Sequence, residues 1–178
     1  MDSFEVTGGK KLKGEIVPQG AKNEALQIIS AVLLTPEKVT ISNIPDILDV
    51  NLLIELLGDM GVKINRTGRD TCIFQADDVD IDFLHSATFR QKSGRLRGSV
   101  MTAGPMLARY KKAFIPKPGG DKIGRRRLDT HIIGFEKLGA AFTYHNDGGY
   151  FLLEAKNLHG VNLLLDEPSV TGTANIVM

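Results

Sequence analysis

The sequence has 178 residues, and its 22 Lys and Arg residues nearly balance 21 Asp and Glu residues, for a formal net charge of +1. This balance excludes a strongly basic protein drawn to nucleic acid or to anionic membrane, and no apolar run reaches the roughly 18–20 residues that cross a bilayer. With 42% hydrophobic residues, one cysteine (Cys72) and no signal-peptide pattern, we expect a cytoplasmic globular protein without an internal disulfide.

The first part of the chain predicts a helix–strand–helix–hairpin unit. Apolar residues at helical spacing predict two helices, and the second of them ends at Gly61. Short alternating runs around a turn-rich segment predict a closing pair of strands. In order, the predicted elements are a helix over 21–34, a strand over 38–41, a helix over 49–60, and strands over 62–64 and 71–74.

The second part repeats that order. We expect a helix over 99–109, a strand over 112–115, a helix over 129–138, and strands over 141–144 and 150–153 around the turn 145–149. The matching stops Met60-Gly61 and Leu138-Gly139 lie 78 positions apart (139 − 61). This spacing predicts a duplicated unit.

A third unit begins near the end of the sequence. Residues 161–165 favour a strand, and Ser169 or Thr171 is a plausible N-cap for a helix over 173–178. So short a helix is marginal in water unless more chain packs on it. We therefore expect a fragment of a longer protein, whose unfinished apolar edges favour self-association.

Basic residues gather at the predicted helix starts. Three arginines, 125–127, follow a Pro- and Gly-rich loop and precede the helix at Asp129. A second basic cluster spans 90–97, and Lys22-Asn23 begins the first helix. Guanidinium groups beside helix N-termini suit phosphate and carboxylate groups. If helix starts of successive units gather at one rim, they form a pocket for a polyanion.

The chain resembles the UDP-N-acetylglucosamine 1-carboxyvinyltransferase family of enolpyruvyl transferases. The resemblance rests on Gly20-Ala21-Lys22-Asn23, on Arg97 ahead of 104–109, and on the loop 118–131, and it runs in register from Phe4 to Met178. It implies an α/β fold of repeated βαβαββ units in an inside-out domain, truncated within the third unit. Residues 1–21 would belong to a second domain and 22–178 to the first, with units at about 22–84 and 85–157.

The resemblance also implies a reaction. Enolpyruvyl would pass from phosphoenolpyruvate to the 3-hydroxyl of UDP-N-acetylglucosamine with release of phosphate, at the entry to peptidoglycan synthesis, without a cofactor. Lys22 and Arg126 would act on phosphoenolpyruvate, and Asp121 would complete the catalytic set. The implied substrate-binding residues are Lys22, Asn23, Arg97, Arg126, Arg127, Leu128, Asp129, Thr130, Ser169 and Val170.

Two positions depart from the family pattern. Asp121 stands where many members carry a cysteine that acts as general acid and that fosfomycin alkylates, so the resemblance implies an aspartic acid donor and insensitivity to fosfomycin. A free aspartate has a pKa near 3.9, and we expect desolvation in a closed, liganded loop to raise the pKa of Asp121. Glu167 stands where many members have lysine and would repel a diphosphate.

The remaining alternatives are a metal site, a binding module without catalysis and an RNA-processing enzyme. Three of the four histidines, His85, His145 and His159, fall in loops or turns without spaced partners, which argues against a metal site. The fourth, His131, could contact a sugar or orient Asp129. A noncatalytic UDP-sugar-binding module would use the same arginines. An RNA-end-processing relative with the same repeat architecture is disfavoured by the low net charge and by the lack of a counterpart to its histidine nucleophile. The fragment alone is expected to have no turnover.

Overall fold

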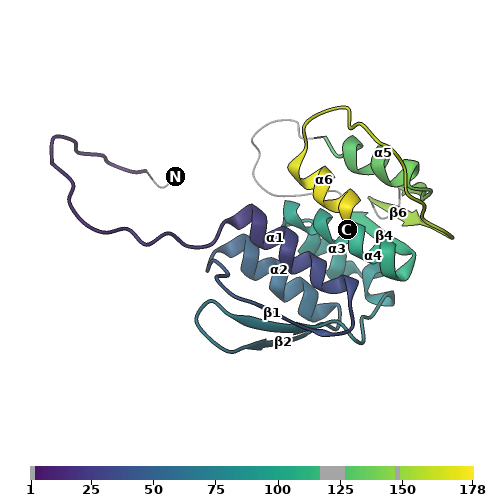
Figure 1. Ribbon diagram of the computed structural model, residues 1–178, viewed down its shortest axis with the longest axis horizontal. Helices are drawn as coiled ribbons and strands as arrows, with labels where there is room; N and C mark the ends of the chain where they lie inside the picture. Colours follow the sequence, from purple (N-terminus) through teal and green to yellow (C-terminus); the bar gives the residue numbers. More distant parts are fainter. Residues whose placement is uncertain (1–2, 117–126, 147–148) are drawn as a thin grey trace.

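A computed structural model describes residues 3–116, 127–146 and 149–178. Residues 3–21 form no helix or strand and run away from the body as an extended arm (Figure 1). Four of its apolar side chains, Phe4, Val6, Leu12 and Ile16, are at least 88% exposed. The prediction that residues 1–21 belong to a second domain stays a prediction.

The first unit contains helix α1 (Lys22–Ala31), the 3-10 turn η1 (Val32–Leu34), strand β1 (Lys38–Ile41), helix α2 (Leu48–Asp59) and strands β2 (Lys63–Arg66) and β3 (Cys72–Gln75). The central strand β3 pairs antiparallel with both β1 and β2. Helix α2 forms here because its apolar side chains recur at helical spacing, and Leu53, Leu56 and Leu57 are fully buried.

The second unit repeats this arrangement. Strand β4 (Lys112–Pro116), helix α5 (Asp129–Lys137) and strands β5 (Ala141–His145) and β6 (Tyr150–Glu154) follow helix α4 (Ala103–Tyr110). Its sheet has the order β4-β6-β5, the same as β1-β3-β2 in the first unit. Helix, strand and sheet order therefore recur, and the chain has the predicted α/β fold of repeated units.

The two glycine stops are equivalent in detail. Gly61 has φ +95° and Gly139 has φ +102°, the left-handed conformation that glycine adopts without a Cβ penalty. The N–H of Val62 donates to Leu57 O, and the N–H of Ala140 donates to Phe135 O, again 78 positions later (140 − 62). Each helix thus ends in the same hydrogen-bonded turn.

The helices lie inside and the sheets outside. The 3-10 segment η3 (Arg97–Thr102) and helix α4 occupy the interior, where residues 99–107 are all buried. Strands β1, β2 and β5 have no buried residue. Figure 1 shows α1 and α2 side by side above strands β1 and β2, with α5 and α6 further up in the view. One apolar core runs through both units.

Three predicted elements differ from the structure. Residues 161–165 form no strand. A strand needs a neighbour that supplies hydrogen-bond partners, and none of the described strands pairs with this segment. The predicted helix over 99–109 begins as the 3-10 segment η3 and becomes α-helical at Ala103. The last helix, α6 (Val170–Val177), starts three residues earlier than expected, with Ser169 as its N-cap.

Two further elements were not predicted at all. The 3-10 turn η2 (Asp82–His85) leads into helix α3 (Ala87–Ser93). The Ser86 hydroxyl caps α3 by accepting a hydrogen bond from the Phe89 N–H at 3.0 Å. Lys92 on α3 forms ion pairs with Glu55 and Asp59 on α2, at 2.5 Å each.

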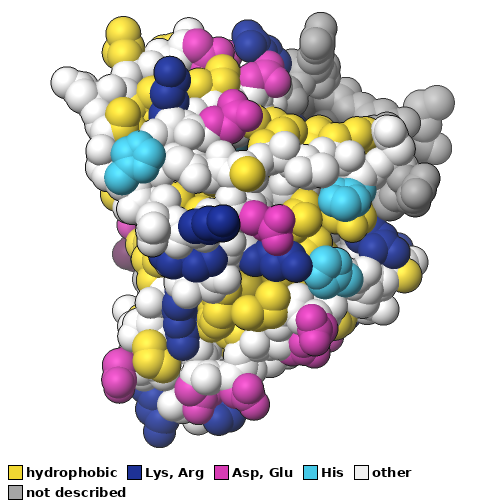
Figure 2. Space-filling model, turned by 90° about the vertical axis from the view of Figure 1, so that its right-hand side faces the viewer, with side chains coloured by type: hydrophobic (Ala, Val, Ile, Leu, Met, Phe, Trp, Pro, Cys, Tyr) yellow, Lys and Arg dark blue, Asp and Glu magenta, His cyan; other side chains and the backbone are white. Residues whose placement is uncertain are grey.

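None of the described helices has the length and apolar character to cross a membrane. Figure 2 shows Lys and Arg side chains intermixed with Asp, Glu and hydrophobic side chains on one face of the molecule. Cys72 is buried in β3, and this burial raises the pKa of its thiol. The thiol is accordingly the inert, buried group that its apolar neighbours predict.

Candidate functional site

The starts of several helices meet at one pocket of about 790 Å³. The first turns of α1, α2 and α6, the start of η3 and the residues just before α5 all contribute to its wall. Since the first N–H groups of a helix have no backbone partner within the helix, helix starts carry a partial positive charge, and this arrangement brings several of them to one place. The geometry is that of an anion-binding site.

The pocket brings together seven residues that the sequence singles out: Lys22, Asn23, Arg97, Arg127, Leu128, Ser169 and Val170. Asp121 and Arg126 lie outside the described residues. Two other predicted residues, Asp129 and Thr130, lie beside the pocket but do not line it. Their side chains contact protein groups instead.

Carboxylates hold several of the cations in place. Lys22 forms an ion pair with Asp49 at the start of α2. Arg127 donates through Nε to Asp129, and its Nη2 lies 3.5 Å from Asp166 Oδ2. The Asp129 carboxylate raises the pKa of Arg127, so this guanidinium stays charged. A ligand with several negative charges would compete with these carboxylates for the cations.

Arg97 joins two parts of the wall. Its Nη2 donates to the backbone oxygen of Arg127 at 3.3 Å, across 30 residues of sequence. Thr130 is buried, and its hydroxyl lies 3.2 Å from Asp166 Oδ1 and 3.4 Å from Glu167 Oε1. The Arg97 contact connects η3 to the segment before α5, and the Thr130 contacts connect the first turn of α5 to the segment before α6.

Sequence reasoning missed several residues of the wall. Arg95 lies in the basic cluster 90–97, which was a usable signal, whereas nothing in the sequence separates Asp49 from other helix-start acids. Glu167, set aside because of its charge, does line the pocket. Thr171 lines it as well, one residue after the predicted pair Ser169 and Val170.

His131 closes the inner side of the pocket. Its side chain is 3% exposed, and burial, helped by the positive charge of Arg97, lowers its pKa to about 4. The ring lies 2.9 Å from Asn175 Nδ2 and 3.4 Å from the Thr171 hydroxyl. At neutral pH it is therefore an uncharged hydrogen-bonding group.

This low pKa has a consequence for stability. Below the ordinary value of 6.5 the unfolded chain binds a proton at His131, whereas the folded chain binds it only near pH 4. We expect His131 to lower the free energy of unfolding by about 3 kcal/mol as the pH drops from 6.5 to about 4, and this contribution to level off at lower pH.

Urea unfolding at several pH values between 7.5 and 4 measures this effect against a His131→Gln variant. Glutamine does not titrate, and its amide oxygen can still accept a hydrogen bond from Asn175. The difference between wild type and variant isolates His131 from carboxylates that titrate in the same range. Equal pH dependence of the two proteins would contradict the assignment.

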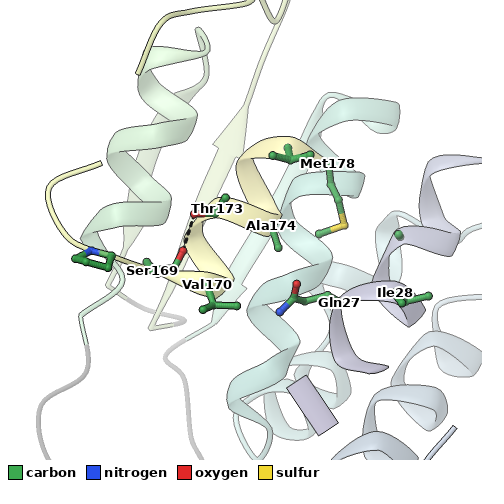
Figure 3. A pocket seen from close by; sticks show the side chains of 10 residues that line it. Gln27, Ile28, Ser169, Val170, Thr173, Ala174 and Met178 are labelled. Carbon is green, nitrogen blue, oxygen red and sulfur yellow. Dashed lines mark hydrogen bonds between the residues drawn. The ribbon is translucent and has the colours of Figure 1, made fainter. Parts of the chain in front are cut away.

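A second pocket, of about 750 Å³, lies between α1 and α6 (Figure 3). Its wall includes Ile28, Ala174 and Met178, and none of the described residues that line it is Lys or Arg. Gln27, Pro168, Ser169 and Val170 belong to both pockets, so the start of α6 separates the two spaces.

Among the described residues, no three His, Cys, Asp or Glu side chains are grouped to hold a metal ion. The charges that line the polar pocket come from Lys and Arg side chains, from Asp49 and Glu167, and from helix starts, an arrangement that suits an anion with several oxygen acceptors.

The family follows from a sequence comparison. The model of the EPSP synthase (3-phosphoshikimate 1-carboxyvinyltransferase) family matches residues 6–178. The chain belongs to the EPSP synthase family. Among curated relatives, the UDP-N-acetylglucosamine 1-carboxyvinyltransferase of Porphyromonas gingivalis is 60% identical over 178 residues, and that of Bacteroides fragilis is 61% identical. Each alignment covers all of this chain and 41% of the relative, so the chain spans about two fifths of their length.

Solved structures in this family share the fold. The enolpyruvyl transferase NikO from Streptomyces tendae has a TM-score of 0.69 at 22% identity, covering 85% of this chain and 32% of that protein. EPSP synthase from Acinetobacter baumannii has a TM-score of 0.60 at 16% identity, covering 94% and 38%. The predicted fold class is confirmed: an enolpyruvyl-transferase-type α/β fold.

Proposed function

We propose that this chain forms the substrate-binding part of a cytoplasmic UDP-N-acetylglucosamine 1-carboxyvinyltransferase. The observation that carries this proposal is the pocket in which Lys22, Arg97 and Arg127 meet at several helix starts. The two relatives of about 60% identity, which bear that name, give the substrate class. The product would enter peptidoglycan synthesis.

The proposed reaction balances as an addition followed by an elimination. The 3-hydroxyl oxygen of UDP-N-acetylglucosamine attacks C2 of phosphoenolpyruvate, its own proton passes to a general base, and a proton is added to C3. The resulting phospho-ketal then loses a proton from C3 and expels inorganic phosphate, leaving the enolpyruvyl ether. Within this chain, Lys22 and Arg126 would neutralise phosphoenolpyruvate, and Asp121 would supply the proton to C3.

The UDP-sugar would occupy the rest of the wall. Arg97 and Arg127 would supply charge on one side, and the start of α6 at Ser169-Val170 would supply uncharged donors on the other. A diphosphate at these positions would be held by charge-assisted hydrogen bonds. The general base and further arginines that the resemblance implies would come from a second domain.

The test needs a complete catalytic cleft, so we would use a chimera. In it, residues of this chain replace the matching residues of the Porphyromonas gingivalis relative, whose remaining sequence supplies the second domain. The chimera is expected to release phosphate when given both substrates, while the 178-residue chain alone releases none. A chimera that binds UDP-N-acetylglucosamine without turnover would favour the noncatalytic UDP-sugar-binding module instead.

Arg97→Gln in this chimera is expected to raise the KM for UDP-N-acetylglucosamine about tenfold or more, because it removes a charged donor from the diphosphate side of the pocket. The dependence of KM on salt should also weaken. Arg69→Gln is the matched control, since Arg69 lies exposed in the turn between β2 and β3 and does not line the pocket. Equal KM values for the two variants would argue against the proposed binding mode.

A further inference from the structure

A buried asparagine connects the pocket to the protein core. Asn175 on α6 is 1% exposed, and its side chain contacts three other elements. Its Oδ1 accepts a hydrogen bond from the Gly104 N–H at 2.9 Å, and its Nδ2 donates to the Val100 backbone oxygen at 2.9 Å. A backbone N–H only donates and a carbonyl only accepts, so these two partners fix which end of the amide is which.

The remaining Nδ2 proton fixes the state of His131. It points to His131 Nδ1, 2.9 Å away, and this nitrogen must therefore be the acceptor. A ring that also carried a proton on Nδ1 would place two donors against each other. The single proton of the neutral ring thus resides on Nε2, which lies 3.4 Å from the Thr171 hydroxyl oxygen. In each contact from Val100 through Asn175 and His131 to Thr171, the donor and the acceptor are therefore fixed.

We propose that Asn175 is a positioning residue of the pocket, which keeps the proton of the His131 imidazole on Nε2 and thereby directs the Thr171 hydroxyl proton to an acceptor oxygen of the bound ligand. Thr171 is exposed and lines the same pocket as Arg97 and Arg127. Since its oxygen accepts from His131, its own proton is left to be donated elsewhere. The Thr171 hydroxyl is therefore an uncharged hydrogen-bond donor in a pocket that also contains the charged donors Arg97 and Arg127.

The proposed ligand chemistry follows from this neighbourhood and rests on the proposed function. Thr171 follows Ser169 and Val170 in the first turn of α6, where the helix dipole favours negative charge. The acceptor that fits is a phosphate oxygen of the nucleotide sugar. The low pKa of His131 agrees with an imidazole that stays neutral while an anion binds nearby.

The first arm of the test does not depend on any ligand. In the ¹⁵N-labelled 178-residue chain, long-range ¹H–¹⁵N spectra of the imidazoles distinguish protonated from unprotonated nitrogens, and His131→Gln assigns the signals of His131. We expect a protonated Nε2 and an unprotonated Nδ1 at pH 7. Asn175→Asp offers only acceptors to the ring, so the proton should move to Nδ1. A wild-type ring protonated on Nδ1, or on both nitrogens, overturns the proposal.

The second arm uses UDP-N-acetylglucosamine titrated into the same chain. Thr171→Val keeps the shape of the side chain without its hydroxyl and is expected to weaken binding by about tenfold, as expected for losing a hydrogen bond to a charged oxygen. Thr171→Ser restores the hydroxyl and should rescue affinity. Thr171 is exposed, so these variants test the proposal even where Asn175→Asp fails to fold.

Equal affinity of Thr171→Val and wild type overturns the role of Thr171. A wild-type chain that binds no UDP-N-acetylglucosamine at millimolar concentration contradicts both that role and the proposed site, whereas the imidazole spectra still decide what Asn175 does to His131. The two failures are therefore distinguishable.

Discussion

Asp121→Asn in the chimera is expected to lower kcat about 10²- to 10⁴-fold, the usual contribution of a general acid. Asparagine is close in size to aspartic acid but has no acidic proton to give to C3 of phosphoenolpyruvate. Substrate binding should change much less than kcat. The limb of the pH–rate profile that reports protonation of Asp121 should disappear, which separates loss of the acid from a general loss of structure.

The matched control is Asp121→Cys, which places the residue of many family members at the same position. This variant should retain activity and become sensitive to covalent inactivation by fosfomycin, to which the Asp121 protein should be insensitive. Unchanged activity of Asp121→Asn at all pH values would show that Asp121 is not the acid. Rapid covalent inactivation of the Asp121 protein would contradict the predicted insensitivity.

Gly104→Ala is expected to lower the free energy of unfolding by about 2–3 kcal/mol, the cost of forcing an extra methyl group into a tightly packed core. A Cβ at this position would lie 2.4 Å from the backbone oxygen of Asn175 and 2.8 Å from its Oδ1. Helix α4 touches α6 here without a side chain between them, so α6 would have to move. Because Gly104 also donates to Asn175, the same change would disturb the hydrogen bonds to His131.

Thermal and urea unfolding of the 178-residue chain measure this loss, with an expected fall in Tm of about 5–10 °C. Gly58→Ala is the control, because a Cβ there would meet only Ile64 Cδ1 at an ordinary 3.5 Å. Gly58 lies in α2, where alanine should stabilise the helix by about 0.5–1 kcal/mol. If Gly104→Ala were as stable as Gly58→Ala, the close packing of α4 on α6 would be refuted.

The duplicated fold could be predicted because its signals are local. Helical spacing in α2 and α5, short strand runs and glycine stops recur at one interval, and each needs only neighbouring residues to be recognised. Residues 161–165 misled this reasoning, since a strand exists only with a partner, and a short run that is mostly apolar does not show whether one is present. Helix α3 was missed because it has seven residues and a mostly polar sequence.

The site was predictable only in part. Basic residues beside predicted helix starts, such as Lys22 and Arg97, can be recognised in the sequence. The pocket brings them together as the duplicated architecture predicts. The contact between Asn175 and His131 joins residues 44 positions apart, and nothing in either segment points to the other. Likewise, the pairing of Lys22 with Asp49 depends on how α1 packs against α2, which the spacing within each helix does not reveal.

The first turn of α6 is a wall of two different spaces, one charged and one apolar. Any displacement of Ser169 and Val170 alters both spaces at once. An apolar segment that settles against Ile28 and Met178 and shifts this turn would thereby change the affinity of the charged side for its anion. By thermodynamic reciprocity, the anion would change the affinity of the groove for that segment by the same factor.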